Sequence, residues 1–166
     1  MVGPDGQPVA SYDKLQPFTF GGEADHYTAG CETVLFDWQG LRVAPLICYD
    51  LRFPELFRAA TRRGAQAFVV IANWPTPRVA HWNTLLAARA IENQAYVVGV
   101  NRTGSEPKLD YPGESQILDP QGNQLACAGP GEGILRADIA LDPLLQYRAN
   151  FPALPDMRPD FFPDPT

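Results

Sequence analysis

The stretch of sequence that decides the fold reads Leu46-Ile47-Cys48-Tyr49-Asp50-Leu51-Arg52-Phe53-Pro54-Glu55. The apolar run over residues 43–47 predicts a buried strand that ends just before Cys48. A turn follows, and Pro54 predicts the start of a helix, because the missing N–H of proline costs nothing at the first helical position. Gly64 predicts where that helix ends. The pattern therefore places a thiol at a strand-to-helix elbow.

This elbow favours a reactive cysteine. Backbone N–H groups at the start of a helix lower the pKa of a nearby thiol and can hold an oxyanion. The alternative is that Cys48 only fills the core, since free cysteine is among the most buried residue types. The local pattern leaves both interpretations open.

Apolar runs beyond the elbow predict a layered α/β fold. Residues 67–72 and 96–100 are continuous apolar segments, which are typical of strands covered on both faces. The start and stop signals at Pro54 and Gly64 predict a helix over residues 54–63. Helical spacing from a Thr76 cap to about residue 93 predicts a second one, so that a helix precedes each of these runs. The resulting β-α-β-α-β order is typical of an α/β fold.

The second half of the chain has a different pattern. Short alternating runs predict antiparallel strands at residues 115–118, 124–128 and 134–139. Asp142 is expected to cap a short helix that begins at Pro143. Many of the 17 prolines fall after residue 150. We therefore expect one domain over residues 1–150 and a proline-rich C-terminal arm over residues 151–166.

Composition limits the classes of partner. The 166 residues carry a net charge of −6 without a basic stripe, so a nucleic-acid partner is not expected. No apolar run approaches membrane-spanning length, so no membrane partner is expected either. The three cysteines lack metal-type spacing and leave an odd count, which predicts a reducing, cytoplasmic location rather than a disulfide framework.

Polar residues that could act together lie near the predicted strand ends. Cys48 and Asn73 each follow a buried strand, and sites in open α/β sheets form outside the carboxyl ends of strands. A thiolate nucleophile needs a cationic neighbour or a base, which Lys14 could supply if Glu23 fixed its position. The alternative for Lys14 and Glu23 is two solvated surface charges. A cysteine–histidine pair with His26 or His81 is a further possibility.

The chain resembles the carbon–nitrogen hydrolase (nitrilase) superfamily, and within it the ω-amidase branch. The resemblance runs from about residue 4 to residue 151 and rests on several ordered motifs. They read Asp13-Lys14, Cys48-Tyr49-Asp50-Leu51-Arg52-Phe53-Pro54-Glu55, Ala72-Asn73-Trp74-Pro75, His81-Trp82 and Ala88-Arg89-Ala90-Ile91-Glu92-Asn93-Gln94-Ala95-Tyr96-Val97.

The resemblance implies a nitrilase-type α-β-β-α sandwich that forms a homodimer through its helical face. It implies hydrolysis of a small amide through a thioester on Cys48, with Lys14 as the oxyanion-binding lysine. Glu23 matches the second glutamate of the family, which helps to position substrate and lysine, and the N–H of Tyr49 would complete the oxyanion hole. No metal or other cofactor is expected.

The resemblance also assigns positions around the nucleophile. Asn73 and Trp74 match residues that line the acyl pocket. Arg89 and Glu92 match positions that are expected to tie their helix to its surroundings rather than to contact substrate.

One departure from the family pattern concerns the catalytic glutamate. The family carries this residue on a segment before the lysine strand, and residues 1–13 offer only Asp5 and Asp13 as carboxylates. We therefore expect the chain to be the C-terminal portion of a family member, with an incomplete sandwich and an exposed apolar sheet surface. General base catalysis contributes roughly 10²–10⁴-fold, so weak or absent activity is expected.

Three functions follow as alternatives. The first is hydrolysis of an ω-amide of a dicarboxylate, or of its 2-oxo acid, to the acid and ammonia. The second is a non-catalytic remnant or interaction module of the same fold. The third keeps the enzyme but changes the substrate to a nitrile, a carbamoyl amide or an acyl-transfer acceptor.

Overall fold

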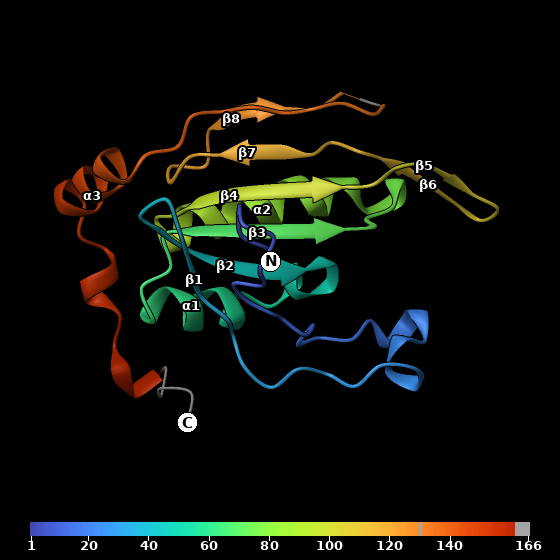
Figure 1. Cartoon of the computed structure of the whole chain (residues 1–166), viewed down its shortest axis with the longest axis horizontal. Helices are drawn as coiled ribbons and strands as arrows, with labels where there is room; N and C mark the ends of the chain where they lie inside the picture. Colours follow the sequence, from blue (N-terminus) through green and yellow to red (C-terminus); the bar gives the residue numbers. More distant parts are fainter. Residues whose placement is uncertain (130, 162–166) are drawn as a thin grey trace.

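The computed structural model describes residues 1–129 and 131–161, which form an α/β fold on one mixed sheet (Figure 1). Six strands lie in the order β1-β2-β3-β4-β7-β8. Their bounds are Phe36–Trp38, Leu41–Ile47, Ala67–Ala72, Tyr96–Asn101, Gln116–Leu118 and Gln124–Cys127. The central strands β2, β3 and β4 are parallel, and the outer strands pair antiparallel. The predicted β-α-β-α-β unit is confirmed.

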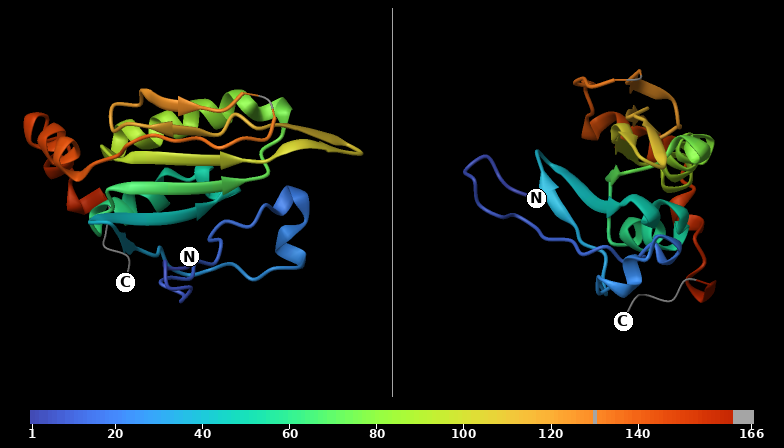
Figure 2. Two further views of the ribbon diagram at one scale, coloured as in Figure 1. Left: turned by 45° about the horizontal axis from the view of Figure 1, so that its top comes forward. Right: turned by 90° about the vertical axis from the view of Figure 1, so that its right-hand side faces the viewer.

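Two helices cover one face of this sheet. Helix α1 spans Pro54–Arg62 and helix α2 spans Val79–Asn93, and both lie on the same side of the strands (Figure 2). A third helix, α3, spans Leu141–Asn150 at the end where the parallel strands begin. Short 3₁₀ turns occupy Thr19–Gly21, Glu23–Asp25, Cys48–Arg52, Thr76–Arg78, Leu154–Asp156 and Pro159–Phe161. In the described part of the chain, no helix combines the length and apolar composition that crossing a bilayer needs.

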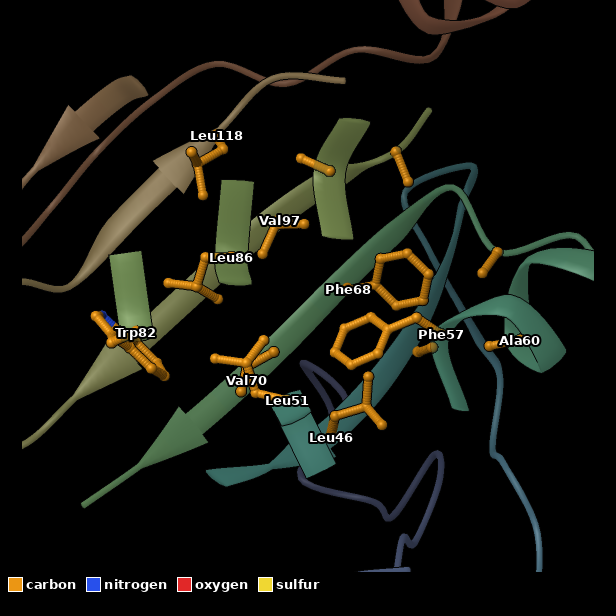
Figure 3. Close-up of a cluster of buried hydrophobic side chains, with 14 of the residues drawn as sticks. Leu46, Leu51, Phe57, Ala60, Phe68, Val70, Trp82, Leu86, Val97 and Leu118 are labelled. Carbon is orange, nitrogen blue, oxygen red and sulfur yellow. The ribbon is translucent and has the colours of Figure 1, made fainter. Parts of the chain in front are cut away.

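The main core lies between the two helices and the sheet. Phe57 of α1 packs against Phe68 of β3 with ring centroids 4.9 Å apart, and Leu86 of α2 is fully buried nearby (Figure 3). Burying one such side chain stabilises the fold by about 1.5–3 kcal/mol. This layer therefore fixes the positions at which β2 and β3 end.

Helix α3 covers the opposite face of the sheet near the start of the strands. Leu144 of α3 packs there with Val43, Ala67 and Tyr96. Nearer the carboxyl ends of the strands, Ile71 is 52% exposed and Val100 is 47% exposed. The expected apolar sheet surface is present. The described residues supply one helical layer and one main sheet, and the four-layer α-β-β-α arrangement stays a prediction.

Three sequence predictions for the second half and the helix starts are wrong. Residues 134–139 form no strand. The chain instead passes over the face of the sheet opposite α1 and α2, where residues 131–135 line a groove with Val98 and Ile117. Helix α3 begins at Leu141, with Ala140 as its N-cap in place of Asp142. The Thr76 hydroxyl does not cap α2, because it donates to the carbonyl of Asp110 instead.

A second, two-stranded sheet was not predicted. Strand β5 spans Thr103–Glu106 and strand β6 spans Leu109–Pro112, and they form a hairpin that projects from the end of β4 (Figure 1). The hydrogen bond from Thr76 to Asp110 joins this hairpin to the turn that precedes α2. The hairpin therefore forms one wall above the ends of the parallel strands.

Candidate active site

A pocket of about 820 Å³ lies at the carboxyl ends of the parallel strands. Cys48 follows β2 and Asn73 follows β3, and the register that pairs Ile47 with Ile71 brings the two strand ends side by side. All the residues predicted for the site line this pocket. They are Lys14, Glu23, Cys48, Tyr49, Asn73 and Trp74.

The backbone at Cys48 is held in an unusual conformation. Its φ is +48°, in the left-handed region that residues with a side chain rarely adopt. Such a residue costs of order 1–3 kcal/mol and persists only where its surroundings over-determine it. The turn Cys48–Arg52 thus presents the thiol at the sharp elbow that the sequence indicated.

The Asp50 carboxylate stabilises this turn through hydrogen bonds, a role that was not predicted from the sequence. Its carboxylate accepts hydrogen bonds from the N–H of Ile47 at 2.9 Å, the N–H of Gln16 at 2.8 Å and the hydroxyl of Tyr12 at 2.8 Å. Asp50 is fully buried, and this burial raises its pKa although the two N–H groups and the hydroxyl act in the opposite direction. One carboxylate therefore ties the nucleophile turn to the segment that carries Lys14.

Arg89 fastens the far side of the same turn to α2. Its Nε and Nη2 atoms donate to the carbonyl of Leu51 at 3.2 Å and 2.8 Å, and its Nη1 pairs with Glu92 at 3.0 Å. Neither Arg89 nor Glu92 lines the pocket. The expected tying role of these two residues is confirmed.

Lys14 and Glu23 form an ion pair inside the pocket. The Lys14 Nζ atom lies 2.5 Å from Oε2 of Glu23, and the same oxygen accepts the N–H of Phe18 at 2.9 Å. The Lys14 side chain is only 16% exposed. Partial burial acts to raise the pKa of Glu23, but the hydrogen bonds from Lys14 and Phe18 outweigh it and lower that pKa. The interpretation of these residues as two separate surface charges is therefore wrong.

The expected lowering of the thiol pKa is also wrong. Burial raises the pKa of Cys48, and the carboxylates of Glu23 and Asp50 add to this effect. The Lys14 ammonium and the backbone N–H of Asn73 act in the opposite direction without cancelling it. Both groups nevertheless act directly on the sulfur, so the site brings an ammonium and an N–H donor to the nucleophile.

Trp74 and Asn101 shape the floor beside Asn73. The Asn101 side chain accepts the N–H of Trp74 at 2.7 Å and donates to the carbonyls of Trp74 and Gly113. The Trp74 indole N–H donates to the carbonyl of Arg78 at 2.7 Å. These bonds fix the loop whose N–H approaches the thiol. The proposed oxyanion role of the Tyr49 N–H stays a prediction.

The cysteine–histidine alternative finds no support in the pocket. In the part of the chain that the structure describes, neither His26 nor His81 lines it. His81 Nδ1 instead lies 3.3 Å from Nη2 of Arg52. No group of three His, Cys, Asp or Glu side chains within residues 1–129 and 131–161 is placed to bind a metal ion.

Basic side chains that were not predicted from the sequence also line the pocket. Arg52 lies over the Trp74 ring at 4.7 Å, and Arg102 lies over the Tyr111 ring at 4.5 Å. Arg78 also lines the pocket, at the end of the turn before α2. The cationic character of the pocket could have been found from the sequence only by knowing that these loops converge.

Comparison with known proteins relates this chain to one family. The family model described as carbon–nitrogen hydrolase matches residues 1–149. A 2-oxoglutaramate amidase from Bacillus subtilis is 42% identical over 95% of this chain and 61% of its own length. An omega-amidase from Yersinia enterocolitica is 46% identical over 94% of this chain and 60% of its own length. The chain thus spans about 60% of the length of these relatives.

Solved structures show the same fold. A CN-hydrolase superfamily protein from Xanthomonas campestris, with an arsenic adduct in its active site, superposes with a TM-score of 0.87 at 39% identity, over 93% of this chain and 61% of its own. A mutant amidase from Nesterenkonia sp. AN1 shows covalent addition of the acetamide moiety of fluoroacetamide at its active-site cysteine. Its TM-score is 0.81 at 32% identity, over 94% of this chain and 56% of its own.

The matched region bears on the expectation of an incomplete domain. The family match over residues 1–149 gives no support to the expectation of an incomplete domain, which stays a prediction. It covers nearly all of the residues that form the sheet, the helices and the pocket. The chain therefore belongs to the carbon–nitrogen hydrolase family.

Proposed function

We propose that this chain hydrolyses a small ω-amide, of a dicarboxylate or of its 2-oxo acid, to the acid and ammonia. The observation that carries the proposal is the convergence of the Cys48 thiol, the Lys14–Glu23 pair and the Asn73 N–H in one pocket. The names of the relatives, 2-oxoglutaramate amidase and omega-amidase, support this class of substrate. A nitrile or carbamoyl substrate is the alternative within the same family.

The geometry supports a two-step mechanism. The Cys48 sulfur, as thiolate, attacks the amide carbonyl carbon, and the Lys14 ammonium stabilises the oxyanion that forms. The proton that the Cys48 thiol gives up on ionising ends on the leaving nitrogen, so the C–N bond breaks, ammonia departs, and the tetrahedral intermediate collapses to a thioester on Cys48. Water then attacks the thioester carbon, and the acid and the free thiol are released. Glu23 keeps the ammonium in place throughout.

Proton transfer is the step for which this pocket is least equipped. The carboxylates that line it in the described residues are Asp13 and Glu23, and Glu23 is already engaged by Lys14 and Phe18. The raised pKa of Cys48 also leaves less of the thiol ionised at neutral pH. Slow turnover by this chain therefore stays our prediction, although the comparisons do not support impairment. The same features favour a non-catalytic form of the fold as the second candidate function.

The test is ammonia release from 2-oxoglutaramate and succinamate by the purified chain. We expect slow release that Cys48→Ala abolishes and Cys127→Ala leaves unchanged, because Cys127 is exposed and lies outside the pocket. Release that persists in Cys48→Ala, or no release from either ω-amide by the unmodified chain, would contradict the proposal.

We also propose that the protein is a cytoplasmic homodimer that pairs through the α1–α2 face. Sedimentation of the purified chain would test its oligomeric state.

A further inference from the structure

The pocket is cationic although the chain as a whole is acidic. Its lining includes four cationic side chains, Lys14, Arg52, Arg78 and Arg102, against two carboxylates, Asp13 and Glu23. The net charge of the chain is −6. A cleft whose lining carries an excess of positive charge attracts anionic ligands and raises their local concentration. A substrate that carries a carboxylate suits this pocket better than a neutral one.

Ion pairs within the protein neutralise two of these four cations. Lys14 pairs with Glu23, and Arg102 pairs with Glu106 of the β5–β6 hairpin. The Tyr111 hydroxyl donates to the same Glu106 carboxylate at 3.3 Å, so this hairpin carries its own counter-charge. Arg102 is therefore already satisfied, and Arg52 and Arg78 remain.

Arg52 and Arg78 differ in what holds their guanidinium groups. Arg52 stacks on Trp74 and contacts His81, which fixes it beside the nucleophile turn. Within the described residues, the Arg78 guanidinium has no hydrogen bond, ion pair or ring contact. It nevertheless lines the pocket and is half-buried. A guanidinium has five N–H donors and no acceptor, so those of Arg78 are available to a ligand.

The backbone of Arg78 is fixed even though its side chain is not engaged. Its carbonyl accepts the Trp74 indole N–H at 2.7 Å, and its N–H donates to Pro75 at 3.0 Å. The bond from Thr76 to Asp110 ties the same turn to the hairpin wall. The turn therefore holds Arg78 at a defined place on the wall of the pocket, with its donors unused.

We propose that Arg78 binds the carboxylate of the substrate that lies away from the scissile amide, and so selects acidic ω-amides over neutral amides. This inference rests on the proposed function, since it names the group that recognises the substrate of that same site. An arginine binds a carboxylate through two parallel N–H···O bonds, a geometry that lysine cannot reproduce.

The kinetic test compares Arg78→Gln and Arg78→Lys with Arg136→Gln. Arg136 is exposed and lies outside the pocket, so its variant controls for the loss of one charge. We expect kcat/KM for 2-oxoglutaramate to fall about 10- to 100-fold in Arg78→Gln, mainly through a higher KM, because the variant loses hydrogen bonds from a charged donor to the substrate carboxylate. Arg78→Lys should recover part of the loss. Hydrolysis of butyramide, a neutral amide, should change less than about twofold. Equal losses on both substrates, or no loss on 2-oxoglutaramate, would overturn the inference.

A binding test separates this inference from the proposed function. Glutarate should slow the alkylation of Cys48 by iodoacetamide, and mass spectrometry of the Cys48 peptide measures this rate. We expect the glutarate concentration that halves the rate to be at least about tenfold higher for Arg78→Gln than for the unmodified chain or Arg136→Gln. Unchanged protection in Arg78→Gln, or no protection of the unmodified chain, overturns the role of Arg78. Protection that depends on Arg78, without any release of ammonia, would contradict the proposed function and leave the binding role of Arg78 standing.

Discussion

The carboxylate of Glu23 accepts the Lys14 ammonium at 2.5 Å and the Phe18 N–H at 2.9 Å through one oxygen, Oε2. That oxygen therefore connects the lysine to the backbone of its own loop. The Phe18 ring in turn packs on the Tyr49 ring, with centroids 4.9 Å apart, next to the nucleophile. The position of the ammonium is thus coupled to the turn that carries the thiol.

Replacing Glu23 by glutamine should separate turnover from thiol reactivity. The negative charge of Glu23 raises the pKa of Cys48, so Glu23→Gln should lower that pKa and speed alkylation at pH 8. The same variant loses a charge-assisted hydrogen bond to Lys14, which should lower kcat/KM for an ω-amide by about tenfold or more. Asp25→Asn, in the same short turn, is the control. Slower alkylation in Glu23→Gln would contradict the electrostatic account.

The pH dependence of Cys48 alkylation should report burial. Because burial raises the pKa of Cys48, the rate should still be rising above pH 8.5, about where an ordinary thiol is half ionised. The Lys14 ammonium lowers the pKa of Cys48, so Lys14→Met should move the profile to still higher pH. Alkylation kinetics followed on the Cys48 peptide measure both, with the exposed Cys127 peptide as an internal reference. A midpoint below that of a free thiol would refute this reading.

Asp50→Asn should destabilise the fold more than a surface replacement does. The NH2 group of asparagine would replace one of the two carboxylate oxygens. It would then face either the N–H of Gln16, or the N–H of Ile47 and the Tyr12 hydroxyl, and these groups are themselves donors. Leaving such a buried group unsatisfied costs about 1–3 kcal/mol in the free energy of unfolding. Urea denaturation measures it. Asp37→Asn removes an exposed carboxylate 3.7 Å from Arg42 and should cost less than about 0.5 kcal/mol.

Gly99→Ala should strain the main core. A Cβ atom at Gly99 would lie 2.5 Å from a Leu86 methyl carbon and 2.9 Å from a Trp82 ring carbon. Overpacking of this kind typically costs about 1–3 kcal/mol. Gly133→Ala is the matched control, because a Cβ atom there meets no atom within 4 Å. Equal thermal midpoints for the two variants would show that the core adapts without cost.

The parts of the fold that were predictable from the sequence are those with strong local signals. Residues 43–47 of β2 and residues 67–72 of β3 are continuous apolar runs, and Pro54 starts α1 as expected. The β5–β6 hairpin lacks such a signal, because Thr103–Glu106 is polar and exposed and holds no apolar alternation. Residues 134–139 do alternate, yet they form no strand, since pairing depends on where the preceding loop directs the chain.

The features of the site also divide into those with a local signal in the sequence and those that depend on distant segments. Cys48, Lys14 and Asn73 could be named from chain order and motif, and the structure places them in one pocket. The raised pKa of Cys48 could not be predicted, because it depends on burial by segments distant in sequence. Asp50 was quoted within a motif, but its supporting role becomes visible only when the N–H of Gln16 reaches it.

The left-handed backbone of Cys48 carries a consequence for protein engineering. Glycine adopts this conformation without steric cost, so a library sorted only for heat resistance gains by replacing the cysteine there. A library sorted for ammonia release must keep the sulfur and tolerate the strained turn. Position 48 is thus a point at which selection for robustness and selection for chemistry pull in opposite directions.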